Sequence, residues 1–162
     1  MIARTKLKPL KAKWTICRLE LLSCVLSRDL IGTIKRAYGT PNDQITCWCD
    51  SQVAVAWINK QDYKSLTVWV SNRVKLIQET GVKFAWIDGL CNPADLGTRT
   101  TGYPKEIMKE FTHGPKFLYK PSSEWSKYTR FKFDKTHKDY SEYLAEFRPE
   151  RVLQTFFISS HS

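Results

Sequence analysis

Hydrophobic residues recur at helical spacing in the first quarter of the chain. Over residues 15–38 the apolar side chains fall three or four positions apart, which predicts an amphipathic helix. The recurring positions are Leu19, Leu22, Leu26, Leu30 and Ile34. Thr15 suits the N-cap of this helix, Gly39 suits the position after its last turn, and Pro41 prevents its continuation.

Three shorter segments have the pattern or composition of strands. Residues 44–49 alternate between two faces, and residues 82–88 are rich in strand-forming side chains. A further short strand is predicted over residues 2–7, which Pro9 then interrupts.

Helical segments separate the last two of these strands. Ser51 can cap a short helix over residues 52–59, and Ser65 can cap a second helix over residues 66–80, which Gly81 ends. Strands that alternate with helices imply an α/β fold whose sheet contains at least one parallel pair.

The pattern changes after residue 100. Aromatic and basic residues interleave with prolines, and no clean period survives. We therefore predict an extended arm over residues 101–135 and a short helix over residues 138–147, which together form an irregular C-terminal extension.

Composition narrows the class of protein. A chain of 162 residues with 42% hydrophobic side chains can build the core of one domain, with or without a tail. It contains no apolar run long enough to cross a bilayer, so no membrane partner is expected. It also shows no secretion signal, so we expect an intracellular protein whose five cysteines are free thiols. The sequence does not distinguish cytoplasm from nucleus.

The net charge of +10 is concentrated near the start of the chain. Residues 1–40 hold nine basic and two acidic side chains, whereas residues 41–100 hold six of each. The candidate nucleic-acid-binding side chains are Lys6, Lys8, Lys11, Lys13 and Arg18. Such a cluster could lie along a phosphate backbone, and a solvated chain end explains it equally well.

Three carboxylates lie on separate predicted elements. Asp50 directly follows the strand over residues 44–49, Asp95 lies in an NPAD loop after the strand over residues 82–88, and Glu20 lies in the first helix. Taken singly, each residue has an ordinary interpretation as a cap, a turn residue or a solvated side chain. Together, they could converge at the carboxyl edge of a sheet and hold Mg²⁺, which prefers oxygen ligands.

Five motifs in order resemble one known family. They are AKWTICRLELLSCVLSRDL, CWCDSQVAVAWI, VWVSNRVKLIQE, WIDGLCNPADLGTRTTG and FTHGPKFLYKPSSEW, and together they cover roughly residues 1–126. They are similar to the TIPRLEL, WTDSxxVLxWI, FVANRVxEIQE, VPGxxNPADxxSRG and WxHGPxFL segments of BEL/Pao retrotransposon polyproteins. The chain therefore resembles the ribonuclease H-like domain of these polyproteins.

The resemblance implies a fold and an activity. The fold is a mixed five-stranded sheet flanked by helices, and the activity is hydrolysis of RNA in RNA/DNA hybrids during reverse transcription. The family's carboxylates carry over to Glu20, Asp50 and Asp95, which would act as catalytic ligands of two Mg²⁺ ions. The implied partners are an RNA/DNA hybrid and the rest of the polyprotein, with reverse transcriptase upstream and integrase downstream.

The sequence departs from the family at its start. The family's first carboxylate is an Asp on the central first strand, and neither that Asp nor the first two strands has a counterpart here. We therefore expect a polyprotein fragment with weak or no hydrolysis by itself. Residues 1–100 would form a partial ribonuclease H-like domain, residues 101–126 a connector with the HGP element, and residues 127–162 a tail.

Two other interpretations stay open at this stage. The chain could be a non-catalytic nucleic-acid-binding remnant, which would need no metal. It could also be a structural fragment that does not fold without further strands, and a cooperative thermal transition would argue against that.

Overall fold

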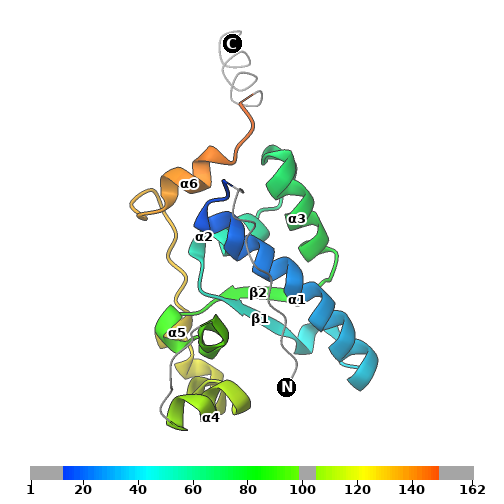
Figure 1. Cartoon of the computed structure of the whole chain (residues 1–162), viewed down its shortest axis with the longest axis vertical. Coiled ribbons are helices and arrows are strands. Elements are labelled where there is room, and N and C mark those ends of the chain that lie inside the picture. Colours follow the sequence, from blue (N-terminus) through cyan, green and yellow to red (C-terminus); the bar gives the residue numbers. More distant parts are fainter. Residues whose placement is uncertain (1–12, 99–104, 150–162) are drawn as a thin grey trace.

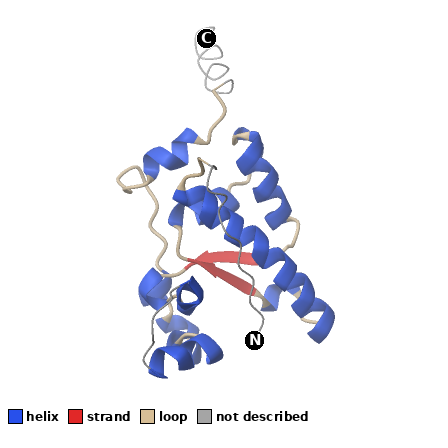
Figure 2. Ribbon diagram, in the orientation of Figure 1, coloured by secondary structure: helices blue, strands red, loops and turns tan. Residues whose placement is uncertain are grey.

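Two parallel strands lie in the middle of the fold, and helices pack around them (Figures 1 and 2). The computed structural model describes residues 13–98 and 105–149. The strands are β1 (Thr46–Cys49) and β2 (Lys83–Trp86), and the α-helices are α1 (Ile16–Tyr38), α2 (Gln52–Ile58), α3 (Val68–Gln78), α4 (Lys105–His113), α5 (Ser126–Thr129) and α6 (Tyr140–Ala145). Among these residues, no helix is both long and apolar enough to cross a bilayer.

The strands β1 and β2 form the parallel pair that the sequence predicts. Thr46 lies opposite Lys83, and Cys49 lies opposite Trp86. The backbone N–H of Ile87 donates to the carbonyl of Cys49 at 3.0 Å, which extends the pairing by one residue. The α/β class is thus confirmed, while the strand expected over residues 2–7 lies outside the described residues.

Helix α1 matches its prediction closely at both ends. The Thr15 hydroxyl accepts a hydrogen bond from the Arg18 N–H, and Gly39 ends the helix with a left-handed φ of 62°. The deeply buried positions are Cys17, Leu21, Cys24 and Ile31. The recurring leucines are only half-buried and lie broadly on the other side, because each residue turns the helix by about 100°.

The two helices between the strands begin differently from one another. The Ser51 hydroxyl accepts from the Ala54 N–H, so the predicted cap of α2 is confirmed. The predicted cap at Ser65 is wrong, because α3 starts at Val68 and Ser65 donates its hydroxyl to the Asp62 carbonyl instead. Residues 65–67 are held by hydrogen bonds to the chain near residue 147. Because of this long-range pairing, the helix begins only after residue 67.

A single apolar core joins α1, α2, α3 and the sheet. Its most deeply buried large side chains are Trp57, Leu21, Leu66, Ile77, Val53, Val55, Val70 and Val74. Burial of these side chains is the main favourable contribution to folding. All five cysteines are free thiols, as expected, and Cys17, Cys24 and Cys49 are buried.

The expectation of an extended arm over residues 101–135 is wrong for most of its described part. Helix α4 occupies residues 105–113, further short helical turns cover residues 116–119 and 122–124, and α5 follows. Phe111 of α4 packs against Gly97, where a Cβ atom would lie 4.0 Å from the ring. The helix was not predicted because its stability depends on this packing more than on its nine-residue length.

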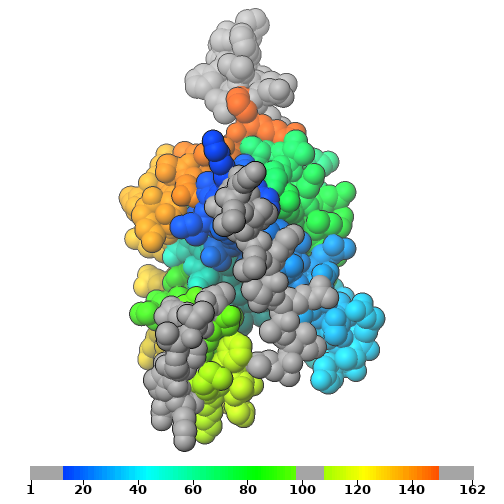
Figure 3. Space-filling model, in the orientation of Figure 1, coloured from blue at the N-terminus to red at the C-terminus, as the bar shows by residue number. Residues whose placement is uncertain are grey.

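The C-terminal segment returns to the core. The predicted helix is confirmed as α6, whose Tyr143 stacks on Trp57 with 6.4 Å between ring centroids. Phe147 pairs with Leu66 in an isolated antiparallel bridge. Figure 3 shows this segment, in orange, beside the beginning of α1 and beside α3. Residues 140–148 therefore belong to the packed body of the protein.

Candidate functional site

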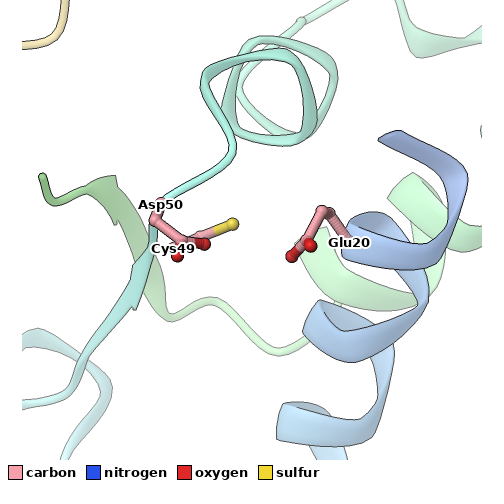
Figure 4. A group of neighbouring side chains, drawn as sticks. All are labelled: Glu20, Cys49 and Asp50. Atoms are coloured by element: carbon pink, nitrogen blue, oxygen red, sulfur yellow. The ribbon is translucent and has the colours of Figure 1, made fainter. Parts of the chain in front are cut away.

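Glu20 lies in the second turn of α1, at the border of the buried face of the helix. Thr15 fixes where the helix begins, and the buried neighbours Cys17, Leu21 and Cys24 fix its rotation. The Glu20 side chain is consequently half-buried, and its carboxylate points toward the end of β1 (Figure 4).

Asp50 is the first residue after β1, at the carboxyl end of the strand. The indole N–H of Trp86 donates to the Asp50 carbonyl at 2.9 Å, and Ser51 caps α2 immediately afterwards. These contacts fix the backbone on both sides of Asp50. Gly89 lies against the carboxylate, since a Cβ atom there would lie 3.6 Å from Asp50 Oδ2, an ordinary contact distance.

The structure brings Glu20 and Asp50 together, as the sequence predicts. One oxygen of each carboxylate and the Sγ of Cys49 all lie within 4.8 Å of one another (Figure 4). The three residues come from two elements that are far apart in sequence, α1 and the end of β1. We refer to Glu20, Cys49 and Asp50 as the carboxylate–thiol cluster.

Asp95 lies near this cluster without belonging to it at that distance. It is part of the turn Pro93–Thr98, which follows a loop shaped by side-chain caps. Asp88 Oδ1 accepts from the Leu90 N–H at 2.9 Å, and Asn92 Oδ1 accepts from the Ala94 N–H at 3.2 Å. The loop thus brings the charge of Asp95 close enough to influence Glu20.

Negative charge is concentrated at the cluster. Burial raises the pKa of Glu20 above its usual value, and the neighbouring charges of Asp50 and Asp95 raise it further. Repulsion among three carboxylates is the condition that a bound cation relieves. The electrostatics therefore favour a cation beside Glu20.

The donor atoms fit a hard divalent cation. Carboxylate oxygens of Glu20 and Asp50 are the ligands that Mg²⁺ prefers, and Asp95 adds a third carboxylate nearby. Cys49 offers a softer sulfur atom, which suits Mg²⁺ poorly. A hydrogen bond with Cys49, together with burial, raises the pKa of the Cys24 thiol well above its usual value. This contact and burial thus favour the neutral form of Cys24, and the carboxylate oxygens of Glu20 and Asp50 are the cluster atoms suited to Mg²⁺.

The candidate nucleic-acid-binding residues divide into three cases. Lys6, Lys8 and Lys11 lie outside the described residues. Lys13 is exposed just before α1. The Arg18 guanidinium donates to both oxygens of Glu146, at 2.5 and 3.0 Å, and lies over the Trp69 ring at 5.1 Å. Arg18 is thus already engaged within the protein.

Two residues near the site carry no signal in the sequence for the positions that the structure gives them. The pairing of Cys47 and Cys49 on one face of the strand over residues 44–49 favours a core position over a metal site, yet the Cys49 Sγ lies in the cluster. Glu146 is 5% exposed and holds both Arg18 and the Thr67 hydroxyl. Its position in a short C-terminal helix pattern carries no signal of burial, because charged residues are seldom buried unless they are paired.

The comparisons with known proteins give one match. Residues 1–51 match the model of the Pao retrotransposon-like RNaseH-like domain, a segment that contains Glu20 and Asp50. No curated protein and no solved structure matches the chain. The resemblance is therefore confirmed for residues 1–51, which carry a Pao-type ribonuclease H-like sequence.

Proposed function

We propose that this chain binds RNA/DNA hybrid and holds divalent cations at Glu20, Asp50 and Asp95, as the ribonuclease H-like part of a retrotransposon polyprotein. The observation that carries the proposal is the approach of Glu20 to Asp50 within the segment that matches the family. Two ionised carboxylates from separate elements repel one another, and a cation between them relieves that repulsion.

The three carboxylates have distinct places in the proposed site. Asp50 presents its oxygens at the carboxyl end of β1, Glu20 faces it from α1, and Asp95 contributes charge from the loop after β2. Mg²⁺ ions, when bound, would polarise the scissile phosphate and activate a water molecule. The backbone contacts around Asp50 keep its carboxylate oriented for this purpose.

The finer fold assignment is part of the same proposal. In it, β1 and β2 correspond to the fourth and fifth strands of a ribonuclease H-like mixed sheet, and residues 1–100 form that domain. The resemblance implies a further Asp ahead of the first helix, whereas no acidic residue precedes Glu20 in the sequence. We therefore expect hydrolysis by this chain alone to be weak or absent.

Cation binding tests the proposal directly. Isothermal titration with Mg²⁺ and with Mn²⁺ should show binding by the full chain and a loss of at least about ten-fold in affinity for Asp50→Asn. Asp43→Asn is the matched control, because Asp43 is an exposed carboxylate in a different turn. Equal affinities of Asp50→Asn and the parent protein would overturn the metal site.

A cleavage assay tests the second part. A hybrid with a labelled RNA strand, incubated with the protein and Mg²⁺, should remain largely intact. Robust cleavage that Asp50→Asn abolishes would contradict our expectation of weak hydrolysis and would show that Glu20, Asp50 and Asp95 suffice for catalysis.

A non-catalytic nucleic-acid-binding role is the second candidate. The net charge of +10 favours it. Hybrid binding that is the same with Mg²⁺ and with a chelator, combined with no cation binding, would support this role over the first.

A further inference from the structure

A basic segment connects α5 to α6. We call residues 127–138 the basic arm. Its cations are Lys127, Arg130, Lys132, Lys135 and Lys138, and its single carboxylate is Asp134. None of these residues belongs to the segment that matches the family.

The five cations of the basic arm face solvent. All of them are exposed, and none forms an ion pair with a carboxylate of residues 13–98 or 105–149. Asp134 is turned toward its own backbone, where it accepts hydrogen bonds from the N–H and hydroxyl of Thr136 at 2.8 and 2.5 Å. Phe131, 43% exposed, adds an aromatic surface between Arg130 and Lys132.

The arm is anchored to the body of the protein at its middle. The Phe133 ring meets Tyr143 edge-on, with 5.0 Å between centroids, and packs against the hydrophobic core. Tyr143 in turn stacks on the buried Trp57. An arm that is held in place loses less conformational freedom when a ligand binds, so its charges are preorganised.

The ends of the arm lie near the two elements that carry the carboxylates. At its start, the Tyr128 carbonyl accepts from the Asp88 N–H at 2.9 Å, one residue before Gly89, which lies against Asp50. Directly after its end, Asp139 lies close enough to α1 to contribute, after burial and Glu142, to the raised pKa of Cys17, three residues before Glu20. Figure 1 shows the arm running from α5 to α6 on the side toward which the arrowheads of β1 and β2 point.

We propose that the basic arm binds the phosphate backbone of the nucleic acid presented to Glu20 and Asp50. This inference rests on the proposed function and names the surface that the nucleic acid occupies. A row of exposed, preorganised cations is complementary to the regularly spaced phosphates of a nucleic-acid backbone.

A charge-removal variant tests the proposal. Anisotropy of a labelled RNA/DNA hybrid is measured against the full chain at several salt concentrations, in a chelator so that no cleavage occurs. Arg130→Ala, Lys132→Ala and Lys135→Ala are combined in one variant. The matched control combines Lys64→Ala, Lys75→Ala and Lys83→Ala, which removes the same charge from exposed positions elsewhere.

We expect the arm variant to lose at least about ten-fold in affinity at low salt, and the slope of log affinity against log salt to fall by about 2 to 3. The control should stay within about three-fold with an unchanged slope. A variant with Arg130→Lys, Lys132→Arg and Lys135→Arg, which keeps the charge, should bind like the parent. Equal weakening by the arm variant and the control would overturn the proposal.

The outcomes also separate this inference from the proposed function. Hybrid binding by the parent protein should persist in chelator, because the arm needs no cation. If the arm variant binds normally while Mg²⁺ binding still depends on Asp50, the arm proposal fails and the metal site stands. If Mg²⁺ binding is absent while the arm variant loses affinity for the hybrid, the metal site fails and the arm proposal stands.

Discussion

The Arg18 guanidinium forms a two-pronged ion pair with Glu146, which lies 128 positions further along the chain. The same carboxylate accepts from the Thr67 hydroxyl, and the Glu146 carbonyl accepts from the Thr67 N–H at 2.7 Å. One buried side chain therefore connects the start of α1, the start of α3 and the C-terminal segment. Because Arg18 is two residues from Glu20, this contact also helps to position the carboxylate–thiol cluster.

Removal of the Glu146 carboxylate should destabilise the protein strongly. Glu146→Ala leaves the Arg18 guanidinium half-buried without its partner, and the expected cost is at least about 2 kcal/mol in the free energy of unfolding. Denaturant unfolding measures this cost. Glu79→Ala, which removes an exposed pair with Lys75, should change stability by less than about 0.5 kcal/mol. Similar losses in the two variants would show that the buried pair contributes little.

The dependence of stability on pH should reveal the raised pKa of Glu20. The pKa of Glu20 is raised in the folded state, so the folded protein binds more protons than the unfolded chain at pH values just above the ordinary pKa. The contribution of Glu20 to stability should consequently fall as pH rises through that window, in a buffer without divalent cations, and the comparison with Glu20→Gln isolates it. Glu20→Gln should be more stable than the parent at neutral pH and equal to it below about pH 4. A parent protein that is the more stable of the two at neutral pH would contradict the crowding of charges.

The Cys49 thiol should not be needed for the binding of Mg²⁺ to the cluster. Cys49→Ser keeps both carboxylates, so we expect its Mg²⁺ affinity to stay within about three-fold of the parent value. Isothermal titration measures it, with Cys91→Ser as a control for the loss of a thiol elsewhere. A large loss of affinity in Cys49→Ser alone would show that the sulfur is a ligand.

Two glycine substitutions should differ in cost. Gly81 has a φ of 65°, and a Cβ atom there would lie 2.6 Å from Asn42 Nδ2, so Gly81→Ala should lose about 1–2 kcal/mol of stability. Gly89→Ala meets Asp50 at an ordinary contact distance and should change stability by less than about 0.5 kcal/mol. Thermal denaturation of both variants compares them, and equal melting temperatures would argue against strain at Gly81.

The full chain should unfold in one cooperative transition. The core extends from α1 through α3 to α6, so the C-terminal segment shares its stability. Melting curves from far-ultraviolet circular dichroism and from tryptophan fluorescence should coincide. Curves that separate, or a gradual slope without a transition, would favour a fragment that needs further strands to fold.

Local features of the sequence determined much of the fold. The limits of α1 depend on Thr15 and Gly39, and the start of α2 depends on Ser51, so short-range capping rules sufficed. The alternation of strands and helices implied the parallel pair of β1 and β2. The order of the motifs then selected Glu20, Asp50 and Asp95 as the candidate site.

The features that failed prediction depend on contacts between distant residues. Residues 65–67 resemble a helix start, but the Thr67 N–H donates to the Glu146 carbonyl and the Ser65 carbonyl accepts from the Arg148 N–H. The engagement of Arg18 by Glu146 is equally invisible in sequence, because nothing local marks a charged residue as buried.

The sequence by itself determined which carboxylates could form a site and which segments could be helices or strands, because caps, spacing and strand propensity act over a few residues. Only the tertiary structure decided that Glu20 and Asp50 meet beside the Cys49 sulfur. It also decided that the basic arm lies on the side of the molecule toward which β1 and β2 point. Packing against a shared core sets those distances, and packing combines residues from the whole chain.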